Sequence, residues 1–315
     1  MNVLLVGCGS IGKRHLKNLI DVHQVKKIFV YSKVKDCLSG LKKTSKVFRV
    51  ESLKDVAADF AIIANETYQH VDTALLLAKK GIHLFIEKPL SHGRSRKLSA
   101  LKVIMRRKKI NIGIGYNLRF LGAMKWIKTI LSKGILGDLY FVKIEAGQYL
   151  PGWRSGRDYR SSYSASQRRG GGVALDLSHE IDYMRYLFGD PYSFKTVKAK
   201  VSDLKIDSDD IFEGIYVYDR FLCNVHLDYL QKNKKRVIQI EASKGSVVCD
   251  LISKKMIIEI SGKKKVIADQ KFFDLDKTYR EEILSFIRSM EKGQKPEVTF
   301  DNGLKVLELI EAKHV

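Results

Sequence analysis

The chain has 315 residues, of which 45% are hydrophobic and 10% are aromatic. This length predicts two domains that each bury a core, and this composition excludes the disordered and fibrous classes of protein. The formal net charge of +22 is spread along the whole chain without a nucleic-acid-binding motif, so we expect an anionic substrate or cofactor and no nucleic-acid partner.

The first predicted strand, residues 3–6, is wholly apolar, as in a parallel sheet covered on both faces. A GxGxxG sequence follows at once, and residues 13–20 have helical spacing, so the motif lies in the strand–turn–helix context that dinucleotide binding requires. Free N–H groups at the start of that helix would receive the phosphates. The predicted cofactor contacts here are Gly7, Gly9, Ser10, Ile11 and Gly12.

The second predicted strand, residues 27–31, ends without the carboxylate that usually holds the ribose 2′-hydroxyl of NAD. Ser32, Lys33 and Lys35 follow instead, which favours a 2′-phosphate. We therefore predict NADP as the cofactor, held by Ser32 and Lys33, with NAD as the alternative. In the competing interpretation, Lys33 and Lys35 are simply solvated.

A third buried strand, residues 60–64, ends in a polar segment and leads into a helix that reaches residue 80. A polar strand end is expected to contact the ribose and the nicotinamide. His70 stands near a helix start, where a histidine is more often a cap or a packing residue. The candidate cofactor contacts of this segment are Ala64, Asn65, Thr67 and His70.

The next apolar strand, residues 82–86, ends at Glu87-Lys88-Pro89. Proline pushes the residue before it into extended geometry, and ligands bind at the carboxyl ends of parallel strands. An ammonium group in desolvated surroundings can exchange a proton near neutral pH, so Lys88 is a candidate catalytic residue. The alternative is a strand-ending turn with a solvated lysine. A helix (94–109) and a strand (110–115) follow. The candidate cofactor contacts of this part of the chain are Glu87, Lys88 and Asn117.

Strands and helices stop alternating after the helix predicted at residues 121–133. The turn Ser243-Lys244-Gly245 and similar short connections predict antiparallel pairing. We expect a Rossmann domain (1–118, a doubly wound parallel sheet) and a substrate-binding and oligomerisation domain (119–315, α+β with an open, mainly antiparallel sheet). An apolar uncovered face of that sheet would be a dimer surface. The predicted strands are 140–150, 194–204, 211–218, 221–230, 237–242, 246–251 and 256–260, and the closing helices are 276–292 and 302–313.

The segment 153–182 is the densest in chemical groups. Three glycines, Gly170 to Gly172, would let the backbone approach a ligand closely. Asp176, His179 and Asp182 are spaced by three residues, which puts them along one face of a single helix. A histidine flanked by carboxylates has the form of a proton relay. The alternatives are a buried His–Asp pair that orders the helix, and a metal site, for which the spacing supplies no convergent third ligand. We predict no metal. Arginines at 154, 157, 160, 168 and 169 suggest an anionic substrate.

Several features bear on compartment and surface. Cys8, Cys37, Cys223 and Cys249 lack disulfide and metal spacing, which is typical of a reducing cytoplasm. No apolar run approaches a membrane span and the N-terminus lacks a basic leader, so we expect no membrane partner. Basic clusters at 106–109, 232–236 and 263–265 are expected in solvated loops and at helix ends.

These motifs together resemble the Gfo/Idh/MocA oxidoreductases. The resemblance rests on GCGSIG near the N-terminus, Glu87-Lys88-Pro89, the segment 115–120 (GYNLRF), and three glycines followed by Asp and His. The closing helices fit as well, through Tyr279, Phe286, Gly293, Pro296, Thr299, Asp301 and Gly303. The segment 176–182, with Arg154 and residues 158–160 upstream, is similar to a branch associated with bacterial surface-sugar biosynthesis.

The resemblance implies an NAD(P)-dependent dehydrogenase that acts on a CH–OH group of a sugar or nucleotide sugar, and a homodimer or homotetramer assembled through the C-terminal sheet. It implies that Lys88 lies beside the nicotinamide and the reacting hydroxyl, that His179 is the acid/base with Asp176 as helper, and that Trp153 and Arg154 lie near the cofactor. Better-known members place the histidine four residues after the aspartate, and here it is three, which leaves open which of the two meets the substrate. The rival from another class is a non-catalytic NAD(P)-binding sensor or regulatory subunit.

Overall fold

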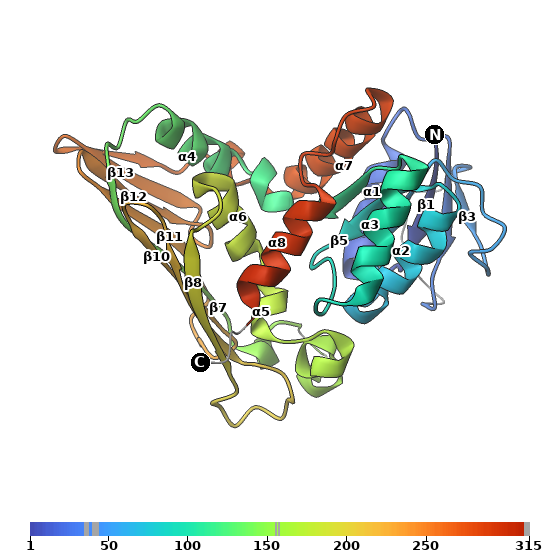
Figure 1. Ribbon diagram of the computed structural model, residues 1–315, viewed down its shortest axis with the longest axis horizontal. Coiled ribbons are helices and arrows are strands. Elements are labelled where there is room, and N and C mark those ends of the chain that lie inside the picture. The colour runs from blue at the N-terminus through green and yellow to red at the C-terminus, as the bar shows by residue number, and fades with distance from the viewer. Residues whose placement is uncertain (35–37, 40–43, 155, 157, 312–315) are drawn as a thin grey trace. The chain divides into compact units, whose positions relative to one another are not determined.

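Two units, each built around one β-sheet, make up the chain (Figure 1). The computed structural model describes residues 1–34, 38–39, 44–154, 156 and 158–311, so Lys35, Cys37, Arg157 and Lys313 lie outside the described residues. The first unit comprises Met1–Asn117 and Asp276–Leu307, and the second comprises Leu118–Leu275 and the chain from Glu308. The division at residue 118 is within one residue of the prediction, but residues 276–307 belong to the first unit and not to the second.

The sheet of the first unit is parallel throughout, in the order β3-β2-β1-β4-β5-β6. Its central strands are buried on both faces, which explains their unbroken apolar sequences. The order reverses beside β1, as in a doubly wound fold, and the predicted Rossmann architecture is confirmed. The strands are β1 (Asn2–Val6), β2 (Lys27–Tyr31), β3 (Val47–Arg49), β4 (Phe60–Ile63), β5 (His83–Glu87) and β6 (Ile112–Gly115).

Helices cover this sheet on both faces. The first helix, α1, packs against one face together with α7, because Leu16, Ile283 and Phe286 share a core with Val3 and its neighbours. The apolar stripe of α7 therefore completes the Rossmann core, which is why residues 276–307 join the first unit. The helices of this unit are α1 (Ser10–Ile20), η1 (Thr67–Gln69), α2 (His70–Lys79), α3 (Arg96–Lys108), α7 (Leu275–Glu291) and most of α8 (Phe300–Ile310).

The sheet of the second unit has eight strands in the order β14-β13-β12-β11-β7-β10-β9-β8. All neighbours pair antiparallel except β7 and β10, so the predicted open, mainly antiparallel sheet is confirmed. The strands are β7 (Leu139–Gly147), β8 (Ser193–Ala199), β9 (Ile211–Val217), β10 (Leu222–Asp228), β11 (Lys235–Ala242), β12 (Gly245–Asp250), β13 (Lys255–Ile260) and β14 (Lys263–Ile267).

Helices lie along one face of this sheet, where α5 contacts β9 and β10 and α6 contacts β7 (Figure 1). Among the described residues, no helix has the length and apolar character needed to cross a membrane. The α-helices are α4 (Gly122–Ser132), α5 (Val173–Asp176) and α6 (His179–Phe188), and the short turns are η2 (Asn117–Phe120), η3 (Leu150–Gly152), η4 (Tyr159–Ser161), η5 (Tyr163–Ala165), η6 (Gln167–Arg169) and η7 (Gln270–Phe273).

The basic cluster at 263–265 was expected in a loop or at a helix end, and this expectation is wrong. Lys263, Lys264 and Lys265 begin β14, an edge strand that pairs with β13. The pairing with β13 holds this polar segment as a strand, and its charged lysines discourage pairing with another chain. The cluster at 106–109 does lie at a helix end, where Lys109 adopts φ +53° directly after α3.

Candidate active site

The glycine loop joins β1 to α1. Gly7 has φ +89°, and a Cβ there would lie 2.5 Å from the carbonyl oxygen of Ala64. A Cβ on Gly12 would lie 2.1 Å from the carbonyl oxygen of Gly7, so the loop turns tightly against the end of β4. Gly9, by contrast, has open space on its Cβ side, and no side chain of the described residues caps the N-terminus of α1. A close backbone approach beside a free helix N-terminus fits a pyrophosphate.

The segment after β2 is held by an arginine that sequence reasoning missed. Arg49, the last residue of β3, donates hydrogen bonds to the carbonyl oxygens of Ser32 (3.1 Å) and Val34 (3.3 Å). The hydroxyl of Ser32 accepts a hydrogen bond from the amide of Val34 at 3.1 Å, and Lys33 is exposed. Two cations, Lys33 and Arg49, therefore stand at the end of β2, where the ribose of a dinucleotide is expected.

The polar segment after β4 is tied together by its own side chains. Asn65 donates to Gln69 Oε1 (3.2 Å) and to Thr73 Oγ1 (3.0 Å), and Thr67 begins η1. The buried ring of His70 has Nδ1 at 2.9 Å from the carbonyl oxygen of Pro89 and Nε2 at 3.1 Å from that of Asn65. Burial lowers the pKa of His70. These contacts favour the packing role for His70, because they link the ends of β4 and β5.

Lys88 is half-buried and directly follows β5, and its bond to Pro89 is cis. The preceding carboxylate, Glu87, is buried; its Oε1 lies 2.5 Å from His15 Nε2 and its Oε2 accepts from the Lys88 amide at 3.3 Å. A Cβ on Gly115 would lie 3.1 Å from the Glu87 carboxyl group. The backbone on both sides of Lys88 is thus fixed, by Glu87 before it and by the contact of Pro89 with His70 after it.

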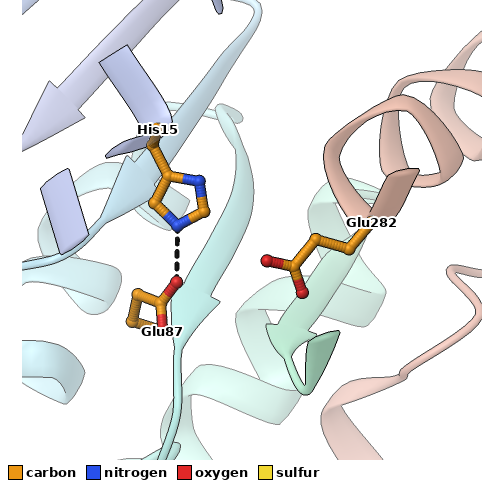
Figure 2. A group of neighbouring side chains, drawn as sticks. All are labelled: His15, Glu87 and Glu282. Carbon is orange, nitrogen blue, oxygen red and sulfur yellow. Dashed lines mark hydrogen bonds and ion pairs between the residues drawn. The ribbon is translucent and has the colours of Figure 1, made fainter. Parts of the chain in front are cut away.

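Two further residues of the first unit belong to this neighbourhood. Asn117 is buried and donates to Thr278 Oγ1 of α7 at 2.7 Å. Glu282, also of α7, is buried with its carboxyl group directed at the pair formed by His15 and Glu87 (Figure 2). The donor atoms of His15, Glu87 and Glu282 lie within 4.8 Å of one another. Sequence reasoning missed this group, because its members come from three separate elements.

Asp176 is the centre of a second group, which lies in the second unit. Tyr229 donates its hydroxyl to Asp176 Oδ2 at 2.7 Å, and the ring of Trp153 packs edge-on against Tyr229 with centroids 5.1 Å apart. The guanidinium of Arg154 lies 5.0 Å from the ring centre of Tyr163. The negative charge of Asp176 and, to a smaller extent, burial raise the pKa of Tyr163. Trp153, Arg154 and Asp176, which were singled out from the sequence, therefore gather with two tyrosines that were not.

His179 begins α6, and Asp176 ends α5, so the two stand on separate helices. The expectation of one continuous helix is wrong, because Leu177, between them, has φ −99° and ψ +28°. The expectation that Asp182 joins a relay is also wrong: both of its oxygens accept from Arg119, at 2.8 and 2.7 Å. Of Asp176, His179 and Asp182, only Asp176 and His179 remain candidates for a proton relay.

Two buried ion pairs fix the first turn of α6. Arg119 binds Asp182 through two hydrogen bonds, and Arg236 of β11 binds Glu180 in the same way, at 2.6 and 3.0 Å. Bidentate pairs of this kind restrict orientation as well as distance. They hold α6 in a fixed rotation, and with it His179, which is 9% exposed.

The three glycines before α5 approach groups of the chain itself. A Cβ on Gly171 would lie 2.2 Å from the carbonyl oxygen of Tyr163. Gly172 has φ +122°, and a Cβ there would lie 2.3 Å from Asp209 Oδ1. These contacts account for Gly171 and Gly172 without a ligand, and Gly170, at φ +80°, ends η6.

Side chains of the types that can bind a metal lie close together once among the described residues, at His15, Glu87 and Glu282. No such group forms around His179 in the part of the chain that the structure describes. The metal alternative for the segment 176–182 therefore has no support in the geometry.

Both halves of the chain match models of one family. Residues 1–116 match the model described as oxidoreductase family, NAD-binding Rossmann fold, and residues 124–248 match the GFO/IDH/MocA C-terminal domain. The chain belongs to the Gfo/Idh/MocA family. The model that matches residues 1–116, which include the glycine loop, is that of an NAD-binding Rossmann fold.

Individual relatives agree with the family in sequence and in fold. Myo-inositol 2-dehydrogenase of Thermotoga maritima is 24% identical and covers 98% of this chain and 93% of its own. Levoglucosan dehydrogenase in complex with NADH and levoglucosan has a TM-score of 0.83 at 17% identity, with 98% and 96% covered. The WlbA dehydrogenase of Bordetella pertussis in complex with NADH and UDP-GlcNAcA has a TM-score of 0.81 at 18% identity, with 98% and 92% covered. The two structures share the fold of this Gfo/Idh/MocA protein.

Proposed function

We propose that this protein is an NAD(P)-dependent dehydrogenase that transfers a hydride between a nicotinamide and a hydroxyl or keto carbon of a sugar or nucleotide sugar. Its family is one of oxidoreductases with an NAD-binding Rossmann domain. The names of relatives support a polyhydroxylated substrate, since they refer to myo-inositol and levoglucosan. The complex of WlbA with UDP-GlcNAcA supports a nucleotide sugar, and with it a place among the surface-sugar enzymes of the family.

The observation that carries this proposal is the fixed position of Lys88 directly after β5. Lys88 therefore lies at the carboxyl ends of the parallel strands, where ligands bind in such sheets. The cofactor supplies the hydride chemistry when bound. The proposed roles of the chain are proton transfer to or from the reacting hydroxyl by His179, support of His179 by Asp176, and polarisation of that hydroxyl by Lys88. The ion pairs at Glu180 and Asp182 would keep His179 oriented for this step.

We propose NADP as the preferred cofactor. The absence of a carboxylate directly after β2 and the presence there of the exposed Lys33 support a 2′-phosphate. The proposed cofactor contacts are Gly7, Gly9, Ser10, Ile11, Gly12, Ser32, Lys33, Ala64, Asn65, Thr67, His70, Glu87, Lys88, Asn117, Trp153 and Arg154. Of these, His70 and Glu87 have their polar atoms bound within the fold, so we propose that they act by holding Lys88 in place.

A homodimer or homotetramer through the sheet of the second unit, acting in the cytoplasm, completes the proposal. On the outward side of three neighbouring strands, Val197, Ile215 and Leu222 are 59%, 49% and 51% exposed. Exposed apolar side chains on adjacent strands are typical of an interface between copies. Cys223 and Cys249 are free and buried, which supports a reducing compartment.

The direct experiment is a turnover assay of the purified protein with NADP(H) and NAD(H) across a panel of sugars, inositols and nucleotide sugars. We expect cofactor-dependent oxidation or reduction of at least one class. Tight cofactor binding without turnover of any of them would favour the non-catalytic sensor instead.

A further inference from the structure

The group formed by His15, Glu87 and Glu282 joins three elements of the first unit (Figure 2). His15 lies on α1, the helix that begins at the glycine loop, Glu87 ends β5, and Glu282 lies on α7. All three side chains are buried, with exposed fractions of 0%, 6% and 2%. The glycine loop, the strand that carries Lys88 and the closing helix therefore meet at three titratable groups.

The carboxyl groups of Glu87 and Glu282 are buried, and their donor atoms lie within 4.8 Å of each other. Ionising both would cost much free energy, because two like charges would then face each other away from water. Glu87 is compensated: it accepts from His15 Nε2 and from the amide of Lys88. Neither oxygen of Glu282 has a hydrogen-bond partner among the residues that the structure describes. The nearby charged and titratable groups are His15 and Arg14 of α1, Glu87 of β5, and Tyr279 of α7, and the guanidinium of Arg14 lies over the ring of Tyr279.

We propose that His15, Glu87 and Glu282 form a proton-sharing positioning cluster, in which Glu282 keeps its proton so that Glu87 can stay ionised against His15. Burial, and then the charge of Glu87, raises the pKa of Glu282 well above its ordinary value. The cluster fixes the carboxyl end of β5 against α1 and α7. Its three members are positioning residues for Lys88, and this part of the inference rests on the proposed function.

The same donor atoms are of the types that bind a divalent cation. A cation would require both carboxyl groups to be ionised, whereas a proton on Glu282 leaves a single negative charge facing the imidazole. The two states therefore differ in the protonation of Glu282, which a neutral isostere can test. Glu282→Gln keeps the shape and the neutrality of the protonated acid and removes its ability to ionise.

The first experiment is an infrared difference spectrum of the wild type and Glu282→Gln at neutral pH. We expect the wild type to show the C=O stretch of a protonated carboxyl group, and the band to be absent in Glu282→Gln. Glu281→Gln is the matched control, because it changes the same group one position away, beside Lys277 on the surface, and should leave the band unchanged. A wild-type spectrum without a Glu282-dependent band would overturn the proposal.

The second experiment follows the melting temperature with pH. An acid whose pKa is raised by folding makes the folded state less stable as pH rises above the unfolded pKa, which is about 4.3 for Glu. The melting temperature of Glu282→Gln should therefore exceed that of the wild type by a margin that grows as pH rises above this value. A variant that is less stable at every pH would contradict this. So would a stoichiometric divalent metal in the purified wild type that Glu282→Gln lacks.

The third experiment tests positioning. Glu282→Ala should lower kcat about 10-fold with the Kd of the cofactor nearly unchanged, because a displaced Lys88 costs rate more than affinity. Glu282→Gln should have a kcat close to that of the wild type. If the site needed a negative charge at position 282, the neutral glutamine would lower kcat as alanine does. The infrared and melting experiments need no substrate, so they test the protonation of Glu282 in the cluster independently of the proposed function. A protein with the expected band and no turnover would instead count against the proposed function.

Discussion

Tyr229 donates its hydroxyl to Asp176 across 2.7 Å, and the two residues are 53 positions apart in the chain. Tyr229 directly follows β10, and Asp176 ends α5 just before His179. The bond therefore ties the candidate helper of the acid/base to the sheet. Both residues are buried, with Tyr229 0% exposed, so water does not replace the bond when it is removed.

Tyr229→Phe should lower the free energy of unfolding by roughly 1 to 2 kcal/mol and kcat by about 10-fold, since Asp176 loses the hydrogen bond from this hydroxyl. Tyr216→Phe is the matched control: its hydroxyl is also buried and donates to the carbonyl oxygen of Leu309 at 2.9 Å. The control should lose comparable stability and keep kcat. Denaturant unfolding and steady-state kinetics check both, and equal kcat losses in the two variants would contradict a specific role for Tyr229.

The ion pair between Glu180 and Arg236 should matter more for stability than any surface pair. Glu180 has an exposed side-chain fraction of 0%, so Arg236→Met leaves a buried carboxylate without its cation. Such a loss costs about 3 to 5 kcal/mol of unfolding free energy. Denaturant unfolding measures it, with Arg220→Met as control, because Arg220 is exposed and lies 3.5 Å from Asp138. Similar effects of the two substitutions would refute the assignment.

The features of the fold that depend on local sequence could be predicted. The apolar run 3–6, the glycine loop and the lysine after β5 each carry their signal within about ten residues, and all three lie where the sequence predicted them. The strand β14 was missed because its lysines match no strand pattern: an edge strand is stabilised by its neighbour and not by burial.

The features that depend on distant contacts could not be predicted. Asp182 was placed in a relay because its spacing fits one, and only the fold reveals Arg119, 63 positions away, as its partner. His15 and Glu87 are 72 positions apart, and nothing in either segment indicates their bond. The closing helix α7 has an apolar stripe that fits any sheet, so its place in the Rossmann core required the structure.

His226 should make stability depend on pH. The hydrogen bond to Asp228 and that to Glu213 raise the pKa of His226 to about 9. A raised folded pKa contributes stability that is full below the unfolded value of about 6.5 and is lost as pH rises through about 9. Because the side chain is partly exposed, we expect the contribution to be about 1 kcal/mol. In denaturant unfolding, the deficit of His226→Gln should be present at about pH 6 and vanish above pH 9; a deficit independent of pH would contradict this assignment.

Lys33 should govern the choice between the two cofactors. Lys33→Ala should weaken NADP(H) binding about 5-fold, as expected for one exposed ion pair with a phosphate, and leave NAD(H) binding unchanged. Lys27→Ala is the control, an exposed lysine at the opposite end of β2. Fluorescence titration of the wild type and both variants with each cofactor gives the six dissociation constants. Tighter binding of NAD(H) than of NADP(H) by the wild type would contradict the proposed preference.

The proposed chemistry is tested most directly by Lys88→Ala. The measurement compares NAD(P)H formation by the wild type and the variant on the same sugar or nucleotide sugar, together with the Kd of the cofactor for each. We predict that kcat falls at least about 100-fold while the Kd changes little, because in the proposed mechanism Lys88 acts on the reacting hydroxyl and the glycine loop binds the dinucleotide. An unchanged kcat in Lys88→Ala would remove this residue from the reaction and contradict the account.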